Sequence, residues 1–247
     1  MFIHSVSPVW AGPEVVGKAA VLMDSKSGKI IYNKDGNQPL PPASTTKIMT
    51  AIIALENGNL QDIVTAGKNP TLVEPSAIGL KEGENITLEN LLYSLMLKSA
   101  NDAAVAIAEH VAGSVPAFAE MMNKKALELG AKNTNFVNPN GLPAKGHVLS
   151  AADLALIAEY ALKNPVFMEI VSTKVKTIPR ENDDDIKWLQ NHNKLLWRYD
   201  KSIGIKTGYT REAQQCLVAA AADEDQELIA VILGSQGSNV WEDAKTL

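Results

Sequence analysis

Three short β-type runs lie near the end of the chain, within the stretch GIKTGYTREAQQCLVAAAADEDQELIAVIL at residues 204–233. They are Gly204–Tyr209, Gln215–Ala222 and Leu228–Leu233, and turn-like or charged residues separate them. Apolar and β-branched runs of this length, separated in this way, predict an antiparallel meander of three strands.

Two further β-type runs, Lys18–Asp24 and Lys29–Asn33, surround a Gly/Ser turn near the start of the chain and predict a hairpin. We expect this hairpin to join the meander in one antiparallel five-stranded sheet. Helical patterns fill the middle of the chain, at Ser44–Asn57, Leu88–Lys98, Asp102–Val111, Ser114–Leu129 and Ser150–Leu162. Strands at both ends and helices between them predict an α+β (mixed α/β) fold with the helices packed on the sheet.

Composition and charge exclude several classes of protein. With 247 residues, 46% hydrophobic content and one Cys, the chain has an ordinary globular composition and no internal disulfide. The net charge is −5 and the sequence has no long basic run, which excludes sequence-independent binding to nucleic acid. No apolar stretch approaches the roughly 20 residues that span a bilayer. Residues 1–14 are expected to be an N-terminal tail or a residual signal segment.

Ser44-Thr-Thr-Lys47 opens one of the predicted helices and is the first motif that can carry chemistry. Positions i and i+3 share a helix face, so the serine hydroxyl and the lysine amine can touch. The amine can remove the serine proton if burial or a second cation lowers its pKa enough to keep it neutral. A helix N-cap Ser with an exposed Lys is the alternative interpretation.

Two other motifs contain side chains that can take part in catalysis or bind a ligand. Ser99-Ala-Asn101 lies where two predicted helices join, so its hydroxyl could relay a proton and its amide could grip a peptide group, although helix capping would also explain it. Lys206-Thr-Gly208 lies on a predicted strand. There the Lys and Thr can bind a carboxylate, and the Gly lets a ligand approach the backbone as an added strand. A lysine that protects a sheet edge from aggregation is the alternative.

The three motifs, in this order, resemble those of the penicillin-recognising serine acyl enzymes. Within that superfamily the sequence is most similar to the D-alanyl-D-alanine carboxypeptidases, the low-molecular-mass penicillin-binding proteins. The resemblance runs from about Val15 to the end of the chain. It implies a transpeptidase-like catalytic domain over residues 15–247 with a penicillin-binding protein/β-lactamase-like fold. The stretches that carry it are Pro42–Thr50, Ser99–Ala103, Asn138–Leu142 with His147, and Gly204–Thr210.

The resemblance also implies a role for each matching residue. Ser44 would be the acylated nucleophile, Lys47 its general base, and Ser99 the relay of a proton to the leaving D-alanine. The substrate-binding residues would be Asn101 on the peptide backbone, Lys206 and Thr207 on the terminal carboxylate, Gly208, Tyr209 and His147. The backbone N–H groups of Ser44 and Tyr209 would form the oxyanion hole. Tyr209 stands where many relatives carry His.

The implied activity is removal of the terminal D-alanine from peptidoglycan stem peptides, with β-lactams as acylating inhibitors and with no metal or cofactor. The implied location is outside the cytoplasm, at the outer membrane face, the cell wall or the periplasm. Membrane association is expected only through a C-terminal segment that relatives carry and this sequence lacks, together with a β-rich second domain. Two alternatives stay open: a class A-like β-lactamase, although no Glu-x-x-x-Asn lies between the second and third motifs, and a non-catalytic sensor of stem peptides or β-lactams.

Overall fold

A five-stranded antiparallel sheet organises the computed structural model, which describes residues 12–181 and 185–247. Its strand order is β2-β1-β9-β8-β7, which confirms that the first hairpin joins the meander. Most of the predicted N-terminal tail, residues 1–11, lies outside the described residues. The strands are β1 (Ala19–Asp24), β2 (Lys29–Lys34), β7 (Ser202–Thr210), β8 (Gln214–Asp223) and β9 (Gln226–Ser235).

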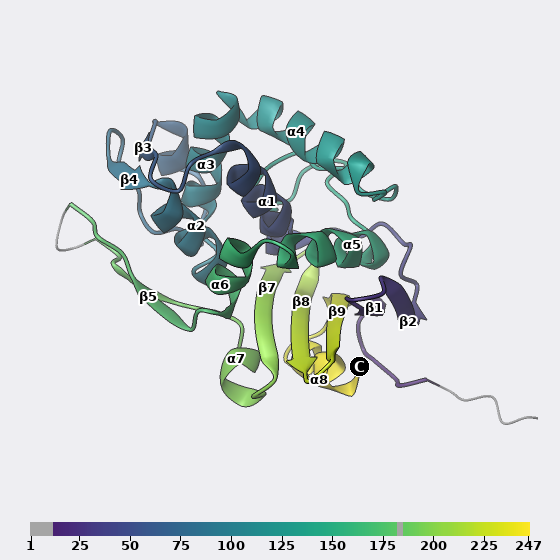
Figure 1. The fold of residues 1–247 in the computed structure, drawn as a ribbon. Helices are drawn as coiled ribbons and strands as arrows, with labels where there is room; N and C mark the ends of the chain where they lie inside the picture. Colours follow the sequence, from purple (N-terminus) through teal and green to yellow (C-terminus); the bar gives the residue numbers. More distant parts are fainter. Residues whose placement is uncertain (1–11, 182–184) are drawn as a thin grey trace, which may run out of the picture.

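Alternate residues of each central strand serve two different apolar layers, because successive side chains of a strand point to opposite faces. In β1, Ala19, Val21 and Met23 belong to the large core shared with the helices. Ala20 and Leu22 belong to a smaller core, to which Val240 of α8 (Asn239–Thr246) also contributes. Figure 1 shows α5 and α6 across one side of the strands, with α1 to α4 beyond them and α8 near the far end of β8 and β9. The predicted packing of helices on the sheet is confirmed.

The predicted helices are present, and side-chain caps mark several of their first residues. Thr87, Ser114 and Ser150 each accept a hydrogen bond from a backbone N–H of the first turn of α2, α4 and α5. The helix predicted from Ser44 begins instead with a 3₁₀ turn, η1 (Ala43–Thr46), before α1 (Lys47–Asn57). The others are α2 (Leu88–Leu97), α3 (Asn101–Ala112), α4 (Val115–Glu128) and α5 (Ala151–Leu162).

Several short elements escaped the sequence prediction. Two hairpins have strands of only three residues, too few to show a period of two. Asn164-Pro165, expected to follow the end of a helix, also begins the next one, because Pro fits the first helical position and Asn164 caps it. The missed elements are β3 (Ile63–Thr65), η2 (Asn69–Leu72), β4 (Asn85–Thr87), α6 (Pro165–Ser172), β5 (Val175–Thr177), β6 (Trp188–Gln190) and α7 (Leu195–Arg198).

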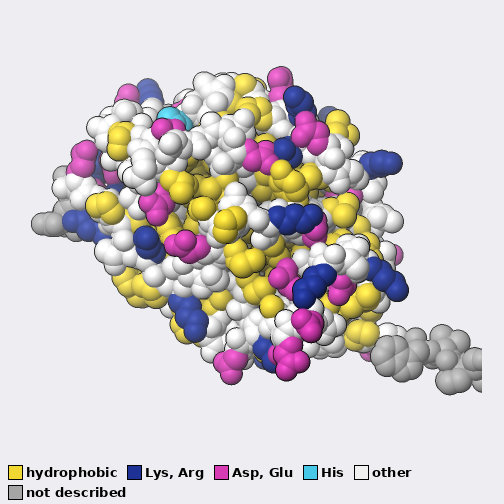
Figure 2. Space-filling model, viewed as in Figure 1, with side chains coloured by type: hydrophobic (Ala, Val, Ile, Leu, Met, Phe, Trp, Pro, Cys, Tyr) yellow, Lys and Arg dark blue, Asp and Glu magenta, His cyan; other side chains and the backbone are white. Residues whose placement is uncertain are grey.

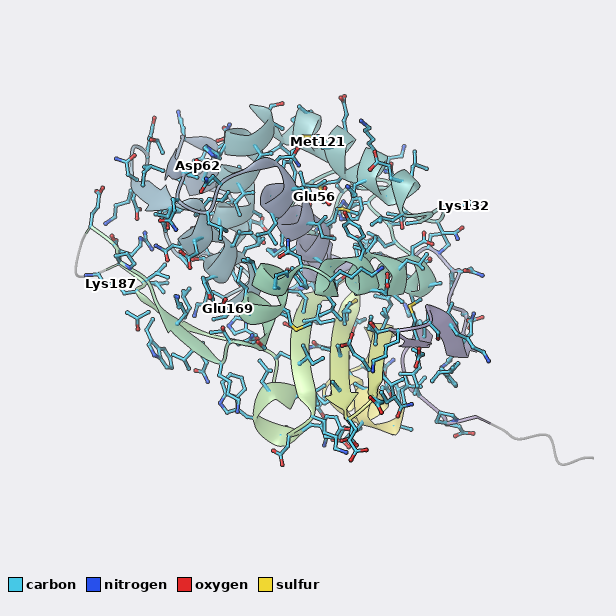
Figure 3. All side chains as sticks on the ribbon, viewed as in Figure 1. Glu56, Asp62, Met121, Lys132, Glu169 and Lys187 are labelled. Atoms are coloured by element: carbon cyan, nitrogen blue, oxygen red, sulfur yellow. The ribbon has the colours of Figure 1, made fainter. Side chains whose placement is uncertain are left out.

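Polar contacts tie the helical layer together at its surface. Glu56, labelled in Figure 3, lies at the end of α1. It pairs with Lys125 of α4 at 2.8 Å and accepts a hydrogen bond from Tyr160 of α5. On the face seen in Figure 2, Lys and Arg side chains are interspersed with Asp and Glu, so neither sign of charge dominates that face. These contacts join the end of α1 to α4 and α5.

Candidate active site

Ser44 and Lys47 lie on consecutive turns where η1 passes into α1. The Lys47 Nζ atom is 3.0 Å from Ser44 Oγ. Lys47 is completely buried, whereas Ser44 is half-buried at the surface of the site. The spacing predicted for the Ser-x-x-Lys motif thus brings the amine and the hydroxyl into hydrogen-bond contact, and the alternative of an exposed lysine is wrong.

The Lys47 amine has two hydrogen-bond partners besides Ser44. Nζ donates to Asn101 Oδ1 at 2.7 Å and to the backbone carbonyl of Asn140 at 2.5 Å. Both of these oxygens can only accept, so they use two N–H bonds of the amine. A neutral amine has two N–H bonds and one lone pair, and the remaining neighbour, the Ser44 hydroxyl, can donate to that lone pair. An ammonium that donates to all three oxygens satisfies these contacts as well as a neutral amine does, so burial and neighbouring charge decide the protonation state.

Electrostatics favours the neutral form of Lys47. Burial holds the pKa of Lys47 well below its usual range, and the nearby charge of Lys206 lowers it further. Lys206 is itself buried, which lowers its pKa to about 7. Two buried ammonium groups that share one site cannot both keep their protons easily, so the charge of Lys206 favours the neutral form of Lys47.

Ser99 and Asn101 occupy the join between α2 and α3, as predicted. Ser99 is nearly buried and has a φ of 61°, a left-handed conformation that is uncommon for a residue with a side chain. Asn101 begins α3 and donates through Nδ2 to the carbonyl of Glu74 at 2.8 Å, while its Oδ1 accepts from Lys47. The join thus places the Asn101 side chain against Lys47, with Ser99 two residues before it in the chain.

Asp102 secures the loop that covers this join. Its buried carboxylate accepts hydrogen bonds from the backbone N–H groups of Ile78 and Leu80. The backbone N–H of Asn101 donates to the carbonyl of Ser76 in the same loop. Asp102 lies in the first turn of α3, and its hydrogen bonds fix the loop beside Asn101.

The Lys206-Thr-Gly208 motif lies on β7, an edge strand of the sheet, with η1 beside it. A Cβ added to Gly208 would lie 2.9 Å from the backbone N of Ser44, so a side chain would not fit between the strand and the nucleophile. Tyr209 follows and is 57% exposed. The two backbone N–H groups predicted to form the oxyanion hole, those of Ser44 and Tyr209, therefore come from segments in close contact. Thr207 is half-buried on the same strand.

His147 lies next to η1 but contacts the residue that precedes Lys47 rather than the reacting pair. Its Nδ1 accepts from the backbone N–H of Val137 at 2.9 Å, which places the proton on Nε2, 2.8 Å from Thr46 Oγ1. Burial, with a contribution from the charge of Lys47, lowers the pKa of His147 to about 4. A neutral ring with both nitrogens engaged links η1 to the loop at 137–147.

Sequence reasoning missed the groups that act through backbone atoms. The carbonyls of Asn140 and Glu74 bind Lys47 and Asn101, but a backbone carbonyl leaves no trace in the residue type. The sequence did point to the first of these segments, because Asn138–Leu142 carries part of the family resemblance.

Among residues 12–181 and 185–247, no group of three or more His, Cys, Asp or Glu side chains is arranged to hold a metal ion.

Comparison with known proteins agrees with this geometry. The family model of the peptidase S11 D-alanyl-D-alanine carboxypeptidases matches residues 6–237. This chain belongs to that family of serine-type carboxypeptidases. Its relatives include the D-alanyl-D-alanine carboxypeptidase DacF of Bacillus subtilis, 42% identical over 223 residues, or 88% of this chain. DacC of Escherichia coli is 36% identical over 92% of the chain.

Solved structures give the same result for the fold. A D-alanyl-D-alanine carboxypeptidase of Mycobacterium tuberculosis matches with a TM-score of 0.89 and 32% identity, covering all of this chain and 93% of that one. A mutant of a Streptomyces DD-transpeptidase matches with a TM-score of 0.90 and 32% identity, over 95% and 97% of the two chains. The expected penicillin-binding protein fold is confirmed.

The peptidase S11 chain covers only part of some relatives. It aligns with 57% of the length of DacF and 59% of DacC. Within the described residues, no helix is both long and apolar enough to cross a bilayer.

Proposed function

We propose that this peptidase S11 chain removes the terminal D-alanine from peptidoglycan stem peptides that end in D-Ala-D-Ala, through an acyl-enzyme on Ser44. The observation that carries the proposal is the contact between Lys47 Nζ and Ser44 Oγ at 3.0 Å, in surroundings that satisfy a neutral amine. DacF and DacC are both named D-alanyl-D-alanine carboxypeptidases, which supports the choice of substrate class.

In the first step Ser44 Oγ attacks the penultimate D-alanine carbonyl while Lys47 takes its proton. The carbonyl oxygen becomes an oxyanion that the backbone N–H groups of Ser44 and Tyr209 stabilise. The tight approach of Gly208 to Ser44 supports this arrangement, because it keeps the two donors close together. Asn101 holds the peptide through its side-chain amide.

In the second half of acylation the C–N bond breaks and D-alanine leaves. Its amine needs a proton, which travels from Lys47 by way of the Ser99 hydroxyl. Lys206 and Thr207 bind the terminal carboxylate, and this bound anion raises the pKa of Lys206 and keeps it charged. Lys47, neutral again, then removes a proton from the water that attacks the ester, and it returns this proton to Ser44 Oγ as the bond between the acyl carbon and Oγ breaks. The final products are the shortened peptide and free Ser44.

The same nucleophile would react with β-lactams, whose carbonyl and carboxylate match those of the peptide. The proposed location is the outer face of the cytoplasmic membrane, the cell wall or the periplasm, because the substrate is found there.

A D-alanine release assay with a D-Ala-D-Ala peptide tests the proposal. The wild-type chain should release D-alanine, Ser44→Ala should release none, and Ser238→Ala, which changes a serine outside the site, should behave as wild type. Rapid penicillin turnover without D-alanine release would favour a β-lactamase instead. Stable penicillin binding without D-alanine release would favour a sensor.

A further inference from the structure

The Asn101 side chain is held between Lys47 and a loop from another part of the chain. Its Oδ1 accepts from Lys47 Nζ at 2.7 Å, and its Nδ2 donates to the backbone carbonyl of Glu74 at 2.8 Å. A carbonyl oxygen can only accept a hydrogen bond, so the NH2 end of the amide faces Glu74 and the oxygen end faces Lys47. The position of the Glu74 carbonyl therefore sets the orientation of the amide that contacts Lys47.

Asp102, the next residue along α3, holds the loop that supplies this carbonyl. Its carboxylate is buried. Oδ2 accepts from the backbone N–H groups of Ile78 and Leu80, each at 3.0 Å. Oδ1 accepts from the backbone N–H of Ala103 at 2.9 Å. Both carboxylate oxygens are thus bound to backbone donors, two of which belong to the loop.

A second buried charge, the guanidinium of Arg180, binds carbonyls of the same loop. Nη1 donates to the carbonyl of Ile78 at 3.1 Å and Nη2 to that of Gly79 at 3.3 Å. The backbone N–H of Asn101 adds a bond to the carbonyl of Ser76 at 2.7 Å. Together with the bonds of the carboxylate, these contacts give the loop one position relative to α3.

We propose that Asp102 is a positioning residue for the acylation reaction. By holding the loop at residues 74–80, it keeps the oxygen of the Asn101 amide turned towards Lys47. The inference rests on the proposed function and deepens it, because it gives a part in the reaction to a buried side chain whose hydrogen bonds all go to backbone N–H groups. When the loop shifts, the amide loses the contact that fixes its orientation.

The charge of Asp102 also affects the pH dependence of the reaction. Burial and the charge of Lys206 lower the pKa of Lys47, whereas the charge of Asp102 raises it. The third titratable group close to Lys47 is His147, whose pKa of about 4 leaves its ring neutral at neutral pH. Replacement of the Asp102 carboxylate by an amide therefore lowers the pKa of Lys47 further, and the acidic limb of the acylation profile moves to lower pH.

Asp102→Asn tests the inference, because the new NH2 group cannot accept from a backbone N–H. This variant should lower kcat/KM for D-alanine release by about 10- to 100-fold, since a misplacement of 1 Å costs about 10²-fold. The acidic limb of penicillin acylation should move to lower pH. Asp153→Asn is the matched control. Asp153 is also a buried acid in the first turn of a helix, and it accepts from the backbone N–H of Asn133 at 2.6 Å. It should leave kcat/KM and the acidic limb at their wild-type values.

A double-mutant cycle with Asn101→Ala shows whether Asp102 acts through Asn101. If it does, adding Asp102→Asn to Asn101→Ala should lower kcat/KM by less than about twofold, because the amide that it positions is gone. Losses that multiply, or an acidic limb that stays in place in Asp102→Asn, would overturn the inference. A purely structural role would lower the folded fraction, measured by circular dichroism, and would change neither of these readouts.

Arg180→Lys displaces the same loop without a change at Asp102, and it replaces Asp102→Asn in the cycle if that variant does not fold. One ammonium cannot reproduce the several bonds of the guanidinium. The loss of kcat/KM in Arg180→Lys should disappear in the Asn101→Ala background, and a loss that persists there overturns the inference. If the wild-type chain releases no D-alanine, the proposed function fails and this inference fails with it.

Discussion

Replacement of Gly208 by Ala tests how closely β7 must approach the nucleophile. The added Cβ would lie 2.9 Å from the backbone N of Ser44, 3.1 Å from Ala43 Cβ and 3.2 Å from the carbonyl oxygen of Pro42. Ordinary contacts begin at about 3.4 Å, so strand and turn must separate by about half an ångström. Two of the three atoms are backbone atoms, which cannot rotate away as a side chain can.

The loss of acylation rate follows from the displacement of β7 away from Ser44. The separation pulls the N–H of Tyr209 away from the N–H of Ser44, the two donors of the proposed oxyanion hole. Loss of one such donor lowers kcat by about 10²–10³-fold, and a misplacement of 1 Å costs about 10²-fold. Half that displacement should slow acylation by about 10- to 100-fold, or about 1.4–2.7 kcal/mol in activation free energy. Overpacking should also cost about 1–3 kcal/mol of unfolding free energy.

The assay is the second-order rate of acylation by a fluorescent penicillin, with unfolding followed separately in urea. Gly12→Ala is the matched control, because a Cβ at that position meets only Tyr32 at an ordinary distance of 3.4 Å. Gly208→Ala should be slow and folded, and Gly12→Ala should match wild type. A folded Gly208→Ala protein that acylates at the wild-type rate would show that the oxyanion hole does not depend on this approach.

Three further predictions concern charge and burial. Lys206→Gln removes one of the charges that lower the pKa of Lys47, so the acidic limb of the pH profile of penicillin acylation should move to higher pH. An unmoved limb would show that Lys206 does not lower the pKa of Lys47. Arg180→Met breaks a buried ion pair with Glu84 and should lower the free energy of unfolding in urea by about 3–5 kcal/mol. Lys163→Met breaks a surface ion pair with Glu159 and should lower it by less than about 1 kcal/mol, so equal losses would contradict this prediction. The pKa of His147 is about 4 in the folded state and about 6.5 in the unfolded state, so the unfolded state binds the proton first as the pH falls. The free energy of unfolding should therefore drop between pH 6.5 and pH 4, by up to about 3 kcal/mol, and His147→Gln should reduce this drop. An equal drop in His147→Gln would show that His147 does not cause it.

The fold was largely predictable because its main elements are long and periodic. The strands of the meander and the helices with Ser or Thr caps carry local signals that tertiary packing does not override. Three-residue strands such as β3 and β5 carry no such signal, and contacts from distant residues stabilise them. Arg180 illustrates this, since it binds Glu84 and the carbonyl of Ile78 from about 100 residues away.

The site was predictable to the extent that side chains define it. Ser44, Lys47 and Asn101 come together as expected, because two motifs on separate helices converge on one amine. The depth of burial of Lys47 and Lys206 depends on the whole fold and could not be derived from the motifs. The same holds for the carbonyl of Asn140, which any residue type could have supplied.

The pH dependence and rate of Ser44 acylation in a Lys47→Met protein test the central claim most directly. Intact-mass spectrometry after a timed penicillin exposure, followed by peptide mapping, measures the fraction of Ser44 that is modified. Wild type should gain the mass of one penicillin on Ser44, increasingly fast as the pH rises through the pKa of Lys47. Lys47→Met, which keeps a side chain of similar length without the amine, should stay unmodified over the same time. Acylation of folded Lys47→Met at the wild-type rate would contradict the claim that a neutral lysine activates the serine.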